Sequence, residues 1–76
     1  MSRLPRVTGD ELIRALERMG FYVHRKKGSH RFLYHREDRS RFAVVAVHRG
    51  ETVPPGTLKA ILRTAGISAE ELQKHL

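Results

Sequence analysis

The 76-residue sequence predicts an α+β fold of two layers, in the order α-β-β-β-α with a short C-terminal helix. Apolar residues recur at helical spacing near both ends of the chain. In the middle, aromatic and β-branched residues dominate and the apolar period becomes two, which is typical of a three-stranded antiparallel sheet. A chain of this length has room for one core, so we expect a single domain over residues 1–76.

The first helix is expected to begin at a capping box. Thr8 can accept a hydrogen bond from the amide three residues on, while the Glu11 carboxylate reaches back to it. Gly20 is placed to end the helix in a left-handed turn. The apolar stripe between these two signals is Leu12, Ile13, Leu16 and Met19. The preceding residues, 1–6, are expected to form a flexible arm.

A β-hairpin is predicted around the pair Gly28 and Ser29, because aromatic and β-branched residues lie on both sides of it. The expected strands are residues 21–26 and 30–35. A two-residue loop with Gly first places Lys27 opposite His30. A regular ladder then gives one face with Phe21, Val23, Phe32 and Tyr34, and with Arg25, Lys27 and His30 at its turn end. A slip of one residue would reverse the two faces.

A third strand is expected at residues 42–47, and by parity it is apolar on both faces. Two explanations remain open for such an outer strand. Either another part of the chain covers its second face, or its edge and surface bind a partner by strand addition or form a homodimer.

Two helices are expected to close the chain. The first runs to about Ala65, with Pro54 or Pro55 suited to its first turn and Gly66 to its end. A second capping box, starting at Ser68, predicts a short terminal helix over residues 68–76.

The charge indicates a polyanionic partner. The chain carries 15 Lys and Arg against 8 Asp and Glu, for a net charge of +7. Residues 24–49 hold eight of these cations and only two acids, and four of the five histidines. The chain has no cysteine, which excludes disulfides and thiolate-bound zinc. It has no apolar segment long enough for a membrane span or a secretory signal, so we expect a cytoplasmic protein.

The candidate site is the turn that carries His30. Its neighbours supply cations, a hydroxyl and turn amides that can hold a phosphodiester, and these are Arg25, Lys26, Lys27, Gly28, Ser29 and Arg31. RNA can be cleaved without a metal when its own 2′-hydroxyl attacks the phosphorus, provided that a side chain moves the protons. Histidine suits that task because it exchanges protons near neutral pH. A non-catalytic interpretation is that His30 only donates a hydrogen bond to a phosphate.

No metal or cofactor is expected. His24 and His35 share a face in the predicted register, but no third ligand accompanies them. Tyr22 and Tyr34 are candidates for stacking on bases, although packing is the simpler role for both.

Three motifs in order give the chain a resemblance to the HicA (YcfA-like) family of small bacterial toxins. They are Gly20-Phe21 after the first helix, Lys27-Gly28-Ser29-His30, and Gly56-Thr57-Leu58 followed by Ile61-Leu62 and Ala65-Gly66-Ile67. The resemblance covers residues 8–68. It implies a fold like that of a double-stranded-RNA-binding domain, and ribonuclease activity on messenger RNA that a HicB antitoxin restrains. It also implies that His30 is the catalytic residue.

The sequence departs from the family pattern in two places. Pro54 and Pro55 precede Gly56 where family members often have a basic residue, and the terminal helix extends past the usual end. Two other classes of function remain as alternatives. A non-catalytic RNA-binding module explains the charge and the fold equally well. A DNA-binding domain fits less well, because the cations concentrate on strands and turns and not on a recognition helix.

Overall fold

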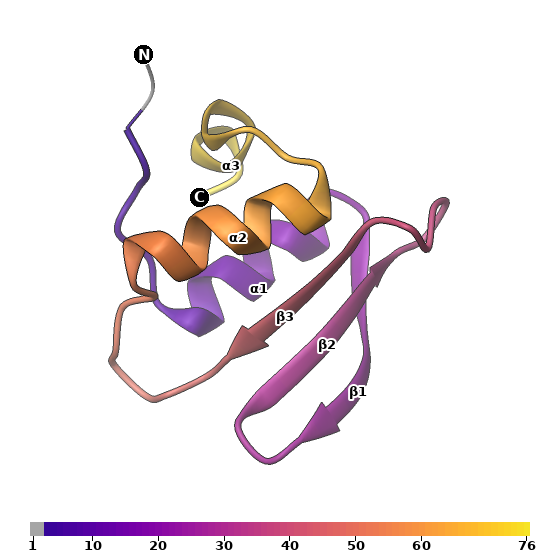
Figure 1. Ribbon diagram of the computed structural model, residues 1–76, viewed down its shortest axis with the longest axis horizontal. Coiled ribbons are helices and arrows are strands. Elements are labelled where there is room, and N and C mark those ends of the chain that lie inside the picture. Colours follow the sequence, from indigo (N-terminus) through magenta and orange to yellow (C-terminus); the bar gives the residue numbers. More distant parts are fainter. Residues whose placement is uncertain (1–2) are drawn as a thin grey trace.

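Residues 3–76 fold into a helix, three antiparallel strands and two further helices, as predicted (Figure 1). The computed structural model describes residues 3–76, so Met1 and Ser2 of the expected arm lie outside the described residues. The elements are α1 (Gly9–Arg18), β1 (Phe21–Lys27), β2 (His30–His35), β3 (Phe42–Ala46), α2 (Pro55–Ala65) and α3 (Ala69–Lys74). The strands form one sheet in the order β1-β2-β3, which makes β3 an edge strand.

The helices and the sheet form two layers around one hydrophobic cluster. Figure 1 shows α1 and α2 on the same side of the sheet, with α3 beyond them. Helix α1 contacts β1 and β3, and α2 packs on β3. The largest fully buried side chains of this cluster are Phe21, Leu12, Leu16, Leu33, Leu58, Leu72, Val7 and Val45. Leu4 packs against the same cluster, so the described part of the arm contacts the core. Within residues 3–76, no helix is long and apolar enough to span a membrane.

The capping signals lie where the sequence placed them. The Glu11 amide donates to Thr8 Oγ1 at 3.2 Å, and the Thr8 amide donates to Glu11 Oε1 at 2.8 Å, which completes the capping box of α1. Ser68 caps α3 in the same way. Gly20 and Gly66 adopt φ of 95° and 70° after α1 and α2, so both helices end in the left-handed turns that favour glycine.

The capping box of α1 predicts a loss of stability in acid. The hydrogen bond from the Thr8 backbone, followed by that from the Thr8 hydroxyl, lowers the pKa of Glu11 from its ordinary value of 4.5. A carboxylate with a depressed folded-state pKa stabilises the fold above its unfolded-state pKa, and this contribution is lost as the pH falls through the folded value. We expect Glu11→Gln to lower the melting temperature at neutral pH and to match the wild type at low pH. A difference that persists unchanged in acid would contradict this role.

Gly9 predicts a second effect on stability. This residue starts α1 against the end of β3, and a Cβ there would lie 2.7 Å from the Ala46 carbonyl oxygen and 3.2 Å from Val47 Cα. Both atoms belong to the backbone, so relief requires the helix to shift. We expect Gly9→Ala to cost about 1–3 kcal/mol of unfolding free energy, measured by denaturant titration.

Gly56 supplies the matched control. It lies in the first turn of α2, and a Cβ there would meet no atom within 4 Å. We expect Gly56→Ala to be neutral or to stabilise the fold by up to about 1 kcal/mol, because alanine is the better helix former. Equal costs at Gly9 and Gly56 would rule out the close approach of α1 to β3 as the cause.

Next to the turn, the hairpin has the predicted register. Lys27 pairs with His30, and Arg25 pairs with Phe32, as a two-residue loop requires. Gly28 begins this loop with φ of 55°. The turn end of the hairpin is therefore built as the sequence indicated.

Beyond the turn, the predicted register is wrong. A β-bulge between Val23 and Arg25 inserts His24 as an extra residue, so Val23 pairs with Leu33 and not with Tyr34. One extra residue reverses the faces of the strand on either side of it. The inner face, turned to the helices, therefore carries Phe21, Val23, Leu33, Ala43 and Val45. The opposite side, here called the outer face, carries His24, Arg25, Lys27, His30, Phe32, Tyr34, Phe42 and Val44.

The second face of β3 is exposed in this chain. Ala43 and Val45 are buried under the helices, whereas Phe42 and Val44 each keep 40% of their surface accessible. The described residues thus leave the apolar outer side of β3 open, so the first of the two explanations does not hold for them.

Candidate functional site

The hairpin turn that carries the candidate site is held by backbone contacts with the neighbouring strand. The Val47 amide donates to the Ser29 carbonyl at 2.7 Å, which ties the turn to the chain just after β3. Gly28 is exposed, and a Cβ added to it would meet no atom within 4 Å. The turn is thus anchored on one side and open to solvent at Gly28.

His30 is the first residue of β2, the central strand. It is flanked by Lys27 on β1 and by Ala46 on β3. Its side chain is exposed, and its imidazole lies nearly parallel to the Phe32 ring, at 15° with 6.5 Å between the centroids. This arrangement presents an accessible imidazole at the end of the outer face.

The predicted cations divide between the two faces of the sheet. Lys27 and Arg25 share the outer face with His30, because they pair with His30 and Phe32 in the ladder. Lys26 pairs with Arg31 on the opposite face. The sheet therefore gathers two of the four expected cations beside His30.

The Arg31 side chain donates hydrogen bonds to the backbone of the turn. Its Nη1 donates to the Gly28 carbonyl at 2.8 Å and to the His30 carbonyl at 3.3 Å. These bonds hold the backbone on both sides of Ser29. Arg31 thus stabilises the turn from the face of the sheet opposite to the His30 side chain.

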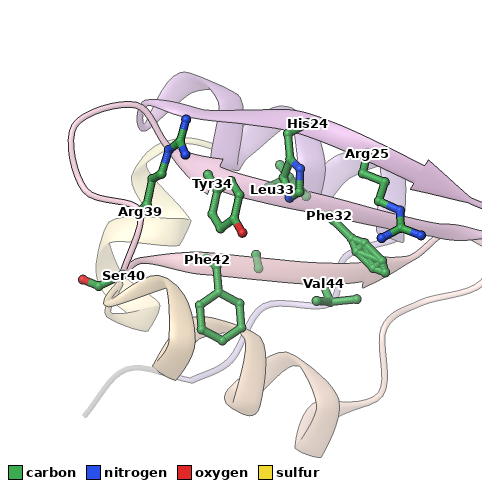
Figure 2. Close-up of a pocket in the computed structure, with 10 residues that line it drawn as sticks. His24, Arg25, Phe32, Leu33, Tyr34, Arg39, Ser40, Phe42 and Val44 are labelled. Atoms are coloured by element: carbon green, nitrogen blue, oxygen red, sulfur yellow. The ribbon is translucent and has the colours of Figure 1, made fainter.

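Aromatic and basic side chains cover the outer face from β1 to β3 (Figure 2). His24 stacks on Tyr34 with 4.1 Å between centroids and 13° between planes. The Arg25 guanidinium lies over Phe32 at 5.7 Å, and that of Arg39 lies over Tyr34 at 5.8 Å. These side chains line a depression of about 500 Å³ that extends to β3.

The structure separates the two histidines considered as a metal pair. His24 lies on the outer face with Tyr34, whereas His35 packs edge-on against the buried Phe21 ring with 5.0 Å between centroids. The His35 Nδ1 also accepts a hydrogen bond from the Glu37 amide at 3.2 Å. Across residues 3–76, no group of three His, Cys, Asp or Glu side chains is placed to hold a metal ion.

Arg41, one of the cations of residues 24–49, packs between a helix and the sheet. Arg41 Nε donates to the Ala65 carbonyl at 2.8 Å, and its guanidinium lies 5.5 Å from the centre of the Phe21 ring. It therefore joins the end of α2 to the sheet. The turn before it is fixed by Asp38, whose pKa is lowered chiefly by the hydrogen bond from the Ser40 hydroxyl and then by that from the Ser40 amide.

The sequence did not reveal the outer-face cluster as a unit. His24, Phe32 and Tyr34 meet because the bulge turns His24 to the side of the two rings. No glycine or proline marks the bulge in the sequence. The alternation of aromatic residues along residues 30–35 was the one visible signal, and Arg39 joins the cluster from the following turn.

The fold and this surface define a small basic α+β domain with an exposed imidazole and cations on one face of its sheet. A family model for the HicA toxin of bacterial toxin-antitoxin systems matches residues 9–67, which is most of the chain. The chain therefore belongs to the HicA toxin family. The match ends just before Ser68, so the terminal helix α3 lies outside it. No individual curated protein matches the chain.

Proposed function

We propose that this toxin is a metal-independent endoribonuclease that cleaves messenger RNA and so inhibits translation. The observation that carries the proposal is the exposed imidazole of His30 at the end of the outer face, with Lys27 directly opposite it in the ladder and Arg25 on the same face. Membership of the HicA toxin family supports a toxic activity. Its messenger RNA substrate would place the protein in the cytoplasm.

The proposed reaction is an internal transesterification of RNA. The 2′-oxygen attacks the adjacent phosphorus and loses its proton to His30, while the bond from phosphorus to the 5′-oxygen breaks. The leaving 5′-oxygen then takes the proton back from His30, so the histidine returns to its starting state. The products are a 2′,3′-cyclic phosphate and a free 5′-hydroxyl.

The groups around His30 have distinct proposed roles. Lys27 and Arg25 stabilise the negative charge that develops on the phosphate oxygens, because both lie on the outer face of the sheet with His30. The backbone amides of Gly28 and Ser29 are candidates to bind an oxygen. Arg31 holds the turn through its bonds to two carbonyls and acts as a positioning residue.

Cleavage of a labelled single-stranded RNA by the purified chain in EDTA tests this proposal. We expect cleavage to proceed, with products that end in a 2′,3′-cyclic phosphate. RNA binding without cleavage would instead favour a non-catalytic RNA-binding module. Cleavage that requires an added divalent ion would contradict the metal-free reaction.

The partner that we propose is a HicB-like antitoxin that covers His30 and the basic turn. Acidic side chains on the antitoxin would suit the cations of this turn. We expect the complex to be inactive and His30 to be protected from modification by diethyl pyrocarbonate. An inactive complex in which His30 reacts as fast as in the free toxin would exclude this mode of inhibition.

A further inference from the structure

The outer face next to His30 forms a continuous aromatic and basic surface. We propose, on the basis of the ribonuclease function above, that this face is a platform on which unpaired bases of single-stranded RNA stack. The platform consists of Phe32, Tyr34 and Phe42, with Arg25 and Arg39 at its borders.

The aromatic row follows the central strand. His30, Phe32 and Tyr34 alternate along the outer side of β2, with a repeat of about 6.6–6.8 Å between successive side chains. Tyr34 is braced by its stack with His24 at 4.1 Å. Phe42 on β3 pairs with Tyr34 and widens the row, and this residue is 40% exposed. Phe32 and Tyr34 are half-buried, so Phe42 is the most exposed ring of the row, and exposed rings are the usual stacking partners of bases.

The charge on this face selects an anionic occupant. The guanidinium groups of Arg25 and Arg39 lie at opposite ends of the depression, over Phe32 and Tyr34 (Figure 2). None of the described residues that line the depression is acidic. Exposed rings beside cations match the composition of a single-stranded nucleic acid, whose bases offer flat apolar faces and whose backbone is negative at every phosphate.

The platform selects unpaired RNA. In a duplex the base faces are buried in the helical stack, so a protein meets only the backbone and the groove edges. A flat row of rings gains contact only with bases that are free to leave the stack. Because the row ends at His30, we expect a strand that stacks along the row to bring a phosphate to the imidazole.

Binding can be measured without cleavage in a His30→Ala background. The probe is a labelled single-stranded RNA oligonucleotide, compared with the same strand annealed to its complement, over a range of salt concentrations. We expect Tyr34→Leu and Phe42→Thr each to weaken single-strand binding by about fivefold or more, with an unchanged salt slope. Arg39→Gln should reduce the salt slope by about one.

A matched control is Lys59→Gln on the exposed surface of α2. It removes the same charge as Arg39→Gln and should change affinity by about twofold or less. Circular dichroism and melting temperature verify the fold of each variant. Should Tyr34→Leu fail to fold, Phe42→Thr and Arg39→Gln carry the test, because both residues are exposed.

Three results would overturn the platform. One is duplex RNA that binds as tightly as the single strand while the aromatic variants bind both normally. Another is a Phe42→Thr variant that binds RNA normally but no longer binds an antitoxin, which would make this face a protein-docking surface. The third is a Phe42→Thr variant that only dissociates a homodimer of the chain. If the wild type fails to cleave but the aromatic variants still lose single-strand binding, the platform stands and the ribonuclease proposal falls.

Discussion

His30→Ala is expected to reduce RNA cleavage by about 10²–10⁴-fold while the protein still binds RNA. The imidazole is exposed, so its removal leaves no cavity and the fold should be unchanged. The measurement is single-turnover cleavage of a labelled RNA, with binding followed in parallel. A variant that cleaves at the rate of the wild type would exclude His30 as the group that moves protons.

Two further variants make this result specific. His48→Ala removes another exposed imidazole, in the loop before α2, and should leave cleavage intact. Lys27→Ala removes the cation opposite His30 and should weaken both cleavage and RNA binding. Equal losses in His30→Ala and His48→Ala would indicate that general positive charge, and not a placed imidazole, accounts for the effect.

Leu33→Ala is expected to produce the largest loss of stability, about 2–5 kcal/mol. Leu33 is 1% exposed, and the bulge in β1 turns it to the helices together with Phe21. In a domain of this size such a loss lowers the melting temperature by about 8 °C or more. Thermal unfolding followed by circular dichroism measures it.

The matched control for Leu33→Ala lies on the other side of the sheet. Val44 is 40% exposed on the outer face, so Val44→Ala should cost about 1 kcal/mol or less. If the two variants lost equal stability, the assignment of the inner and outer faces would be wrong.

The sequence predicted the elements of this fold well because local chemistry determines them. The capping partner of Thr8 is Glu11 and that of Ser68 is Glu71, each three residues further along the chain. Gly66 supplies the left-handed turn after α2. A Gly-first pair fixes the hairpin turn, and the pairing of Lys27 with His30 follows from it. Each of these signals acts over a few residues, so no tertiary information was needed.

The bulge at His24 could not be predicted because its cause is tertiary. A regular ladder and a bulged one satisfy the same local preferences, but only the bulged ladder puts both Phe21 and Leu33 into the core under the helices. The same shift brings His24 and Tyr34 together on the outer face. Lys26 and Arg31 lie away from His30 for a simpler reason, because neighbouring side chains of a strand point to opposite faces.

The central claim is that RNA is cleaved by its own 2′-hydroxyl at His30, on the outer face of the sheet. One modified substrate tests it most directly. The preferred cleavage position is first mapped with wild-type protein in EDTA, and the nucleotide on its 5′ side is then replaced by its 2′-deoxy form. We expect binding to be retained and cleavage at that position to disappear. Cleavage of the 2′-deoxy substrate at the same position and rate would contradict the proposed reaction.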